Sequence, residues 1–596
     1  MITLGKIEPA FKTASIFLLL FSAIFIWYSN IFFIKKRKKE IALYSLFGMQ
    51  KEQIGKLLFF ENLIIGLIAL ALGVGIGALF SKLFVMILMK LMGFTFLATF
   101  QIVINAVIQT IVVFFIIIAI ISFNNYRIIY RNTLIQLLNA EKHAERQPKS
   151  SWISAVVSFL LLGAGYTILF QPIDSSVWDK FGFNGVLFSL LSLTIGTFLF
   201  VRAFIVTLLK KLSSFNSIYF KGINLISISS LLFRIKSNIM VLTIIALLST
   251  ITLFAIGTTT GLYYNMNKII SDSYPVSMMY SVVDAAKDGK IKQIINKNLK
   301  DQILLETQAD YLKVNGDLST TGRMGADFQI NVISENTYQQ LSEKLGIEPK
   351  KKLSGNESII FYDGNLDQNT DPYTGKTVNL TEQEKVKITF YQQETLFNQD
   401  YYPAYMAISD ELYQKLASQT NENKLKIYQI KNENAAGKTF DKIQNLIHDG
   451  ADFIETENEN LFLTRYHYYQ ELKQTYGLLN FISVFLGFVF LLATASILHY
   501  KQLTEATSDQ PRYDILTKIG LNNKQTKQAV GKQLFLIFSI PLVLGIAHSA
   551  ALLTLFARFI HLDMVLPFIF ATVAYLIIHI SFYFHTKHKY LSILKN

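Results

Sequence analysis

The closest approach to catalytic chemistry in this sequence is a pair of Gly-Lys-Thr tripeptides, at 375–377 and 437–439. A phosphate-binding loop also needs a glycine five residues earlier, so that its backbone N–H groups can surround the phosphates. Those positions hold Thr370 and Asn432. The sequence therefore predicts no nucleotide site of its own.

Metal-binding and nucleophilic residues give no site either. The chain has no cysteine, which excludes disulfides, thiolate metal sites and a cysteine nucleophile. Its histidines lack acidic or thiol neighbours at metal-binding spacing, and the pair His585 and His588 fits a basic interfacial tail better than a metal site. No Ser-His-Asp or paired-carboxylate arrangement can be argued from residue order. We expect no catalytic residue, no metal and no other cofactor.

The composition indicates that most of the chain forms membrane-spanning helices. It is 51% hydrophobic and 16% charged, against about 25% charged in an ordinary soluble domain. Apolar runs long enough for a helix to cross a hydrocarbon core of roughly 30 Å recur nine times. One such run could be a buried helix of a soluble protein, but nine favour a polytopic α-helical membrane protein. The runs lie near 14–34, 60–89, 102–123, 152–170, 183–206, 238–263, 476–498, 533–556 and 564–584.

Lysine and arginine are unevenly distributed among the loops. The net charge is +14, but the excess lies in the hydrophobic part, where it reports membrane orientation and not nucleic-acid binding. By the positive-inside rule, the basic loops are cytoplasmic and the N-terminus is outside. The basic segments are 35–59, 124–151, 207–237, 499–532 and the tail after 584, whereas the short opposite loops hold only Lys90, Lys180 and Arg558.

The longest segment between apolar runs, 264–472, would then face the exterior. Its periodicity is helical at 284–300 and typical of strands at 386–391 and 426–430, which predicts an α+β domain. The predicted organisation is an N-terminal unit of three spans (1–130), a middle region of three spans (131–263), the extracytoplasmic domain (264–472) and a C-terminal unit of three spans (473–596).

The two ends of the membrane part resemble each other. EIALYSLFG at 40–48 and RYDILTKIG at 512–520 align at an offset of 472 residues, which also pairs Leu72-Gly73 with Leu544-Gly545. Matching helix order favours an internal duplication over coincidence. Each segment carries an apolar ridge that ends at a glycine, a natural helix stop. Such ridges on cytoplasmic loops suggest docking to a partner, although a juxtamembrane segment that binds anionic lipid is the simpler alternative.

Three alternating glycines lie within the second apolar run. Gly73, Gly75 and Gly77 superficially match a dinucleotide-binding motif, but they lie inside an apolar helix. The spacing of Gly73 and Gly77 instead predicts close packing against another helix.

Several segments resemble a known family. FIWYSNIFFIKKRKKEIALYSLFGM at 25–49, ISSLLFRIKSNIMV at 228–241 and LHYKQLTEATSDQPRYDILTKIGL at 498–521 resemble FtsX-like permease domains, specifically those of bacitracin-export (BceB-type) permeases. The family pattern has ten membrane helices. Met1 falls where the loop after the family's first helix would be, so we expect either that this chain lacks that helix or that its start codon is misassigned.

The resemblance implies a permease subunit of an ABC transporter in the cell membrane of a Gram-positive bacterium. ATP would be bound by a separate ATPase subunit, typically in two copies, and a membrane histidine kinase is a further expected partner. The substrates would be an antimicrobial peptide, such as bacitracin or a lantibiotic, and a lipid-linked cell-wall precursor. The expected contacts with the ATPase are Glu40, Ile41, Leu43, Leu46, Phe47, Gly48, Ile515, Leu516, Ile519 and Gly520.

Two other functions were weighed. An FtsX-like scaffold that regulates cell-wall hydrolases or a sensor kinase without transport is disfavoured by the insertion after the sixth span. A secondary transporter driven by ions would need acidic or paired polar groups at helix midplanes, where only isolated His548 and His579 occur.

Three cations, Lys82, Lys90 and Arg558, lie near the exterior ends of the second and eighth spans. Snorkelling of their long side chains to lipid headgroups explains such residues well. The functional alternative is contact with the pyrophosphate of the lipid-linked precursor, since ammonium and guanidinium groups form charge-assisted hydrogen bonds to phosphate oxygens.

The predicted orientation can be tested because the chain lacks cysteine. A Ser354→Cys variant should react with a membrane-impermeant maleimide on intact cells, whereas Ser45→Cys should react only after the membrane is permeabilised. The reverse pattern of labelling would contradict the orientation.

Overall fold

The computed structural model describes residues 2–94, 103–131, 151–172, 175–220, 222–282, 284–321, 328–349, 351–361, 371, 373–381, 383–392, 394–398, 404–448 and 462–595. It divides into two compact units. The helical unit comprises Met1–Gly261, Tyr476–Phe556 and Met564–Asn596, and the sheet unit comprises Leu262–Thr475 and Ala557–Asp563.

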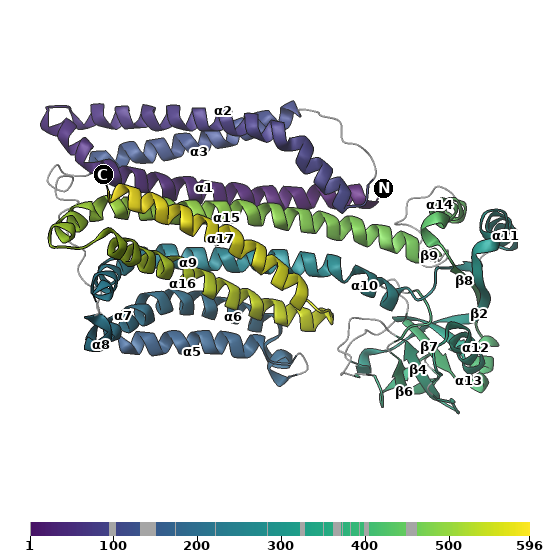
Figure 1. Ribbon diagram of the computed structural model, residues 1–596. Coiled ribbons are helices and arrows are strands. Elements are labelled where there is room, and N and C mark those ends of the chain that lie inside the picture. Colours follow the sequence, from purple (N-terminus) through teal and green to yellow (C-terminus); the bar gives the residue numbers. More distant parts are fainter. Residues whose placement is uncertain are drawn as a thin grey trace. The chain divides into compact units, whose positions relative to one another are not determined.

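Among the described residues, nine stretches of helix are long and apolar enough to cross a membrane, which confirms the predicted fold class (Figure 1). Helices are expected in lipid because each backbone N–H and C=O must be paired within its own segment. The helices of this unit are α1 (Ile2–Leu46), α2 (Lys51–Leu91), α3 (Ile104–Arg131), α5 (Trp152–Leu169), α6 (Ser176–Leu199), α7 (Ile205–Ser214), α8 (Asn216–Tyr219), α9 (Ile223–Tyr264), α15 (Arg465–Lys518), α16 (Asn523–Ile560) and α17 (Val565–Ile593).

Two of these helices are longer than the sequence suggested. The segments 40–48 and 512–520 are not separate amphipathic segments but the ends of α1 and α15. Neither glycine nor proline interrupts α1 between the span and Leu46, so nothing in the sequence ends the helix at the membrane surface. Pro511 lies inside α15 without ending it.

Helix α9 lies at the centre of the helical unit. Its side chains, among them the fully buried Leu242 and Ala246, pack in one cluster with Leu498 of α15 and with Ile537 and Phe538 of α16. The Ser249 hydroxyl lies 2.7 Å from that of Tyr575 on α17. Helix α9 therefore contacts all three C-terminal helices.

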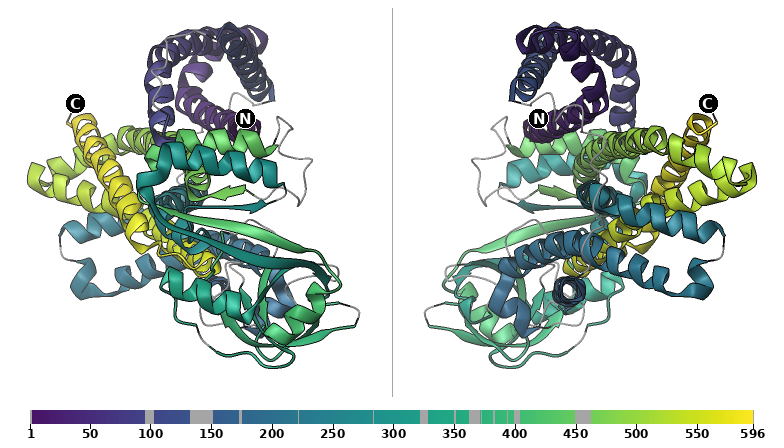
Figure 2. Two further views of the ribbon diagram at one scale, coloured as in Figure 1. Left: turned by 90° about the vertical axis from the view of Figure 1, so that its right-hand side faces the viewer. Right: turned by 90° about the vertical axis from the view of Figure 1, so that its left-hand side faces the viewer.

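The sheet unit contains a nine-stranded mixed sheet with the order β5-β6-β4-β7-β3-β2-β8-β1-β9. Teal and green strands of this unit are visible in the left view of Figure 2. The pairs β3 with β7 and β4 with β6 are parallel, and the other neighbours are antiparallel. The strands are β1 (Met278–Val282), β2 (Ile303–Gly316), β3 (Phe328–Ser334), β4 (Glu357–Phe361), β5 (Thr377–Asn379), β6 (Lys385–Gln392), β7 (Ala404–Ile408), β8 (Glu422–Ile430) and β9 (Phe462–Thr464). The strands predicted at 386–391 and 426–430 are confirmed as parts of β6 and β8.

Helices cover both faces of this sheet. Alternate strand residues point to opposite sides, so neighbouring apolar residues of one strand pack against different helices. On β1, Met278 and Tyr280 pack in one cluster with α11 and α14, whereas Met279 joins a second cluster with α12. The segment 557–563 is held to the same unit by Asn265, whose side-chain amide donates to the Asp563 carbonyl at 2.8 Å. The helices of this unit are α10 (Met266–Ser273), α11 (Ala285–Leu299), α12 (Glu335–Leu345), α13 (Asp410–Ala417) and α14 (Glu433–His448).

Candidate functional site: two repeated turns and a buried ionic cluster

The chain builds the same turn twice, at the ends of α1 and α15. Gly48 and Gly520 have φ angles of 90° and 109°, which favour glycine because a side chain would crowd the backbone there. Met49 N donates to the Tyr44 carbonyl at 3.1 Å, and Leu521 N donates to the Leu516 carbonyl at 3.0 Å. These bonds lie at the same 472-residue offset as the sequence similarity. We call residues 40–50 and 512–522 the first and second repeat turns.

The next helix also begins in the same way after each turn. The side chain of Gln53 accepts from the backbone N–H of Gln50 at 3.1 Å, and that of Gln525 accepts from the N–H of Asn522 at 3.0 Å. This reciprocal capping satisfies donors that a helix start leaves unpaired. The end of the first helix, the turn and the start of the next helix are thus equivalent in the two repeats.

Both repeat turns expose large apolar side chains. Phe47 is 82% exposed and Ile519 is 77% exposed, and Leu43, Leu46 and Ile515 are about half exposed. Gly48 and Gly520 lie at the surface beside them, and Glu40 is exposed and paired with Arg37 at 2.8 Å. Adjacent exposed apolar side chains on a loop are a common mark of an interaction surface.

Two residues expected at this surface lie beneath it. Ile41 is only 2% exposed and packs against Ile54 and Leu58 of α2. Its contact with the ATPase stays a prediction. Leu516 is half-buried and packs beside the cluster around Tyr513. Both side chains fix the turn to the helix that follows. The exposed apolar side chains of the two turns are those of Leu43, Leu46, Phe47, Ile515 and Ile519.

A buried ionic cluster joins α9, α15 and α17 close to the second repeat turn. Arg234 of α9 forms ion pairs with Asp509, in direct contact, and with Glu505 at 3.6 Å. The Arg234 guanidinium donates to the Tyr590 hydroxyl at 3.0 Å, and that hydroxyl donates to Asp509 at 2.9 Å. The side chains of Arg234, Glu505 and Asp509 are all at most 13% exposed.

Further polar groups extend the cluster. The Asn238 amide donates to Glu505 at 3.0 Å, and the Lys501 ammonium lies 3.8 Å from the same carboxylate. Arg512, the first residue of the second repeat turn, donates to the Ser230 hydroxyl of α9 at 2.8 Å. Since these charges are removed from water, each one depends on its partners. Sequence reasoning missed the cluster, although Lys501, Glu505 and Asp509 recur every fourth residue along one helix face.

Within the described part of the chain, no three histidine, aspartate or glutamate side chains are grouped closely enough to hold a metal ion. The buried His548 ring is instead hydrogen-bonded within the bundle, with Nδ1 2.6 Å from the Tyr166 hydroxyl and Nε2 2.8 Å from that of Thr197.

Known proteins resemble this arrangement along nearly the whole chain. The FtsX-like permease C-terminal family matches residues 12–132, which contain most of α1, the first repeat turn, α2 and α3. YvcS of Bacillus subtilis, described as an uncharacterized ABC transporter permease, is 24% identical over 98% of this chain and 90% of its own length. The bacitracin export permease BceB of the same organism is 28% identical over 91% of this chain and 84% of its own length. BceB of Halalkalibacterium halodurans is 26% identical over 91% and 85%.

The chain contains an FtsX-like permease domain and is similar to ABC transporter permeases along nearly its whole length. A permease of this class implies an ATPase partner, and a multi-pass membrane location follows from its apolar helices.

The three cations near the predicted exterior ends lie on two helices of the permease. Lys82 and Lys90 are exposed on α2, two turns apart, and Arg558 is exposed in the last turn of α16. Their contact with a pyrophosphate stays a prediction.

The ionic cluster predicts an asymmetry between single and combined substitutions. Arg234→Met leaves Glu505 and Asp509 buried without their cation, which should destabilise the permease by about 3–5 kcal/mol. Arg234→Met combined with Glu505→Leu and Asp509→Leu removes the three charges that pair with one another, leaves the Lys501 cation of the cluster in place, and should recover part of the loss. The measurement is the amount of folded permease and its apparent Tm in detergent. Equal loss in the single and triple variants would contradict the pairing.

Proposed function

We propose that this permease couples ATP hydrolysis by a separate ATPase to movement of the sheet unit outside the cell. In this proposal, the ATPase docks on the two repeat turns, and the sheet unit acts on an antimicrobial peptide held by a lipid-linked cell-wall precursor. The cell would be Gram-positive, as are the Bacillus relatives, and a membrane histidine kinase would be a further partner.

The observation that carries this proposal is the duplication of an exposed apolar turn. Two equivalent turns, each with exposed side chains such as Phe47 and Ile519, suit a partner that presents the same surface twice. Two copies of one ATPase would do so, since a symmetric pair offers equivalent contacts to two equivalent turns. Binding to a lipid surface would favour basic residues. It would not require exposed apolar residues at equivalent positions of the two repeat turns.

Helix α15 connects the second repeat turn to the sheet unit. Strand β9 ends at Thr464 and α15 begins at Arg465, and the same helix continues to Lys518 at the second repeat turn. At 1.5 Å per residue, its 54 residues span about 80 Å. A force applied at the second repeat turn therefore acts on the helix that is covalently continuous with the sheet.

The proposed substrates rest on the relatives. Two of them are named as bacitracin export permeases, which supports an antimicrobial peptide as the molecule handled. A sheet unit of about 200 residues is large enough to recognise a peptide by adding it to a sheet edge or binding it against a helix. Removal from a membrane-bound precursor would account for a large domain placed beside the membrane surface. Lys82, Lys90 and Arg558 are the proposed contacts for the precursor's pyrophosphate.

The docking proposal predicts the result of placing charge on a repeat turn. Leu43→Asp with Leu46→Asp should abolish co-purification of the cognate ATPase, because two carboxylates would be buried in an apolar interface. Both residues are exposed in the permease, so its own abundance should not change. The matched control is Thr507→Asp with Ser508→Asp, two exposed positions of α15 away from the turn. Normal ATPase stoichiometry in the Leu43 and Leu46 variant would exclude this docking site.

The sheet unit should determine which peptide is handled. When residues 270–470 are exchanged with the corresponding segment of a related permease, the resistance spectrum of the cells should follow the exchanged segment. Minimal inhibitory concentrations for two peptides, each handled by one parent, provide the measurement. A spectrum that remains with the membrane helices would assign recognition to them instead.

A further inference from the structure

Two chain connections leave the sheet next to each other. Helix α10 ends at Ser273 and leads through Tyr274 and Pro275 toward β1, and β9 leads directly into α15 at Arg465 (Figure 1). Strands β1 and β9 are neighbours in the sheet. The start of α15 therefore lies beside the segment that joins α10 to β1.

The Arg465 side chain binds these two connections together. Its Nε donates to the Tyr274 carbonyl at 2.7 Å, and its Nη2 donates to the Pro275 carbonyl. Its Nη1 donates to the Glu433 carboxylate of α14 at 3.1 Å. Both charged side chains are at most 24% exposed, so these charge-assisted hydrogen bonds are largely shielded from water. One planar guanidinium thus holds three acceptors in fixed directions.

Glu433 and Ser277 extend this contact into the sheet. The Ser277 hydroxyl donates to the Glu433 carboxylate at 2.6 Å and accepts from the Ile430 N–H of β8 at 3.0 Å. The Arg465 N–H donates to the Ser277 carbonyl at 3.0 Å. Ser277 is fully buried. We call Arg465, Glu433 and the segment 274–277 the junction.

Aromatic packing supports the junction within the first turn of α15. The rings of Tyr274 and Tyr468 are stacked, with centroids 4.1 Å apart and planes inclined by 11°. A Cβ atom built on Gly437 of α14 would overlap the Tyr466 ring, so α14 lies directly against this turn. The start of α15 is thus held both by the connection from α10 and by α14.

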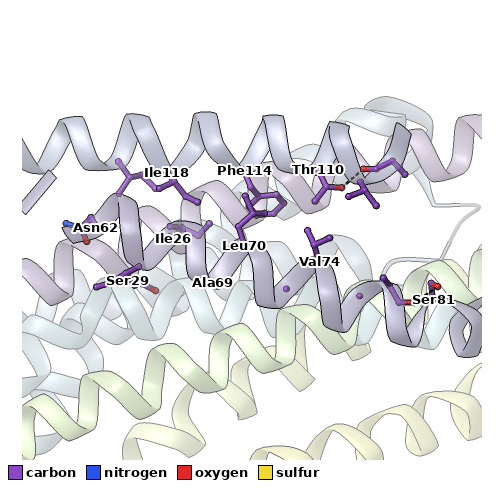
Figure 3. A pocket seen from close by; sticks show the side chains of 18 of the residues that line it. Ile26, Ser29, Asn62, Ala69, Leu70, Val74, Ser81, Thr110, Phe114 and Ile118 are labelled. Carbon is purple, nitrogen blue, oxygen red and sulfur yellow. Dashed lines mark hydrogen bonds between the residues drawn. The ribbon is translucent and has the colours of Figure 1, made fainter. Parts of the chain in front are cut away.

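Helix α2 provides a contrast. An apolar groove with a cavity of about 830 Å³ lies between α1, α2 and α3 (Figure 3). A Cβ atom built on Gly73 or Gly77 of α2 would meet nothing within 4 Å. The close packing predicted for these two glycines is therefore not found among the described residues. Apolar walls fix no single orientation of a helix, because the hydrophobic effect is not directional, whereas the hydrogen bonds of the junction do.

We propose that Arg465 is a positioning residue that makes the sheet unit turn with α15 when the second repeat turn is displaced. This rests on the proposed coupling of a separate ATPase to the sheet unit. A covalent link alone permits rotation about the φ and ψ angles beside it, so chain continuity does not by itself transmit a tilt or a turn. With both connections bound to one guanidinium, rotation of α15 relative to the sheet would break three charge-assisted hydrogen bonds together.

The test compares three substitutions in the full chain. Arg465→Lys keeps the positive charge but loses the planar fork that reaches both carbonyls and the carboxylate. Tyr468→Leu is a second variant, which removes the stacked ring and leaves the hydrogen bonds of Arg465 in place. Lys473→Gln is the matched control, because it removes a cation further along α15 whose described contact is with the Tyr469 ring.

The first experiment measures the rigidity of the junction. Ser271 of α10 and Gln470 of α15 are replaced by cysteine and spin-labelled, which is possible because the chain has no cysteine of its own. Pulsed electron paramagnetic resonance then gives the distance distribution between the labels. The unsubstituted junction and the Lys473→Gln control should give one narrow peak, and Arg465→Lys should lose it.

A narrow peak retained in Arg465→Lys would overturn the proposal. Should Arg465→Lys fail to accumulate as folded protein, Tyr468→Leu decides in its place. Loss of the narrow peak in that variant supports the junction, and its retention overturns it.

The second experiment measures coupling as resistance of the cells to bacitracin, relative to ATP hydrolysis by the permease with its cognate ATPase. Arg465→Lys should lower the minimal inhibitory concentration about tenfold, the change in an equilibrium constant expected from losing a charge-assisted hydrogen bond. Its abundance and ATP hydrolysis should equal those of the unsubstituted protein and of Lys473→Gln. A role in stability alone would instead lower abundance, hydrolysis and resistance together, and that result would also overturn the proposal.

Failure of the proposed function gives a different result from failure of the junction. If the unsubstituted protein confers no resistance to bacitracin, the proposed substrate is at fault, and the distance distribution decides on Arg465. If the unsubstituted protein confers resistance and Arg465→Lys confers the same at equal abundance, the proposed function stands and the positioning role of Arg465 is overturned.

Discussion

The guanidinium of Arg234 connects three helices of this permease. It lies between Glu505 and Asp509 of α15 and bonds to Tyr590 of α17, while its own helix α9 fills the centre of the unit. Breaking one of these pairs inside the bundle would leave a charge with neither water nor partner, so α9, α15 and α17 are expected to move together. The second repeat turn follows directly on this assembly.

The two repeats use the same turn but different means to support the helices behind it. In the N-terminal unit the side chains of Asn30 and Asn125 exchange hydrogen bonds in a buried pair between α1 and α3. In the C-terminal unit the position equivalent to Asn30 is Gln502, and the charges of Arg234, Glu505 and Asp509 provide the connections between helices. The exposed apolar turn is thus common to both repeats, while the buried contacts behind it differ.

The sequence predicted those features that depend on local chemistry. Gly48 and Gly520 are helix stops because the turn needs a positive φ, and this requirement is visible in the residue itself. The nine spans follow from apolar length. The burial of Ile41 could not be predicted. Whether an apolar residue of α1 faces α2 or the surface depends on how α1 is rotated about its axis in the bundle. Gly73 and Gly77 identified a face that admits close packing, but the spacing of two residues does not reveal whether a neighbour is present.

The ionic cluster was missed for a different reason. Arg234 and Glu505 are separated by the whole sheet unit, and no local pattern on α9 identifies which of several basic residues will be buried. The acidic residues were the available signal, since Glu505 and Asp509 lie one turn apart on α15 at the end of a membrane span. A buried position for both would require a cation from another helix.

Proline at position 511 gives α15 an uneven stiffness. A proline inside a helix removes the hydrogen bond to the carbonyl four residues before it, here that of Thr507, and favours a bend at that point. This joint lies between Asp509 of the ionic cluster and the exposed side chains of Ile515 and Ile519. A partner that pulls on the second repeat turn would first flex this joint, and only displacements beyond its range would load the ionic cluster. Small displacements of the second repeat turn would thereby be absorbed at Pro511, while larger ones would pass along the helix.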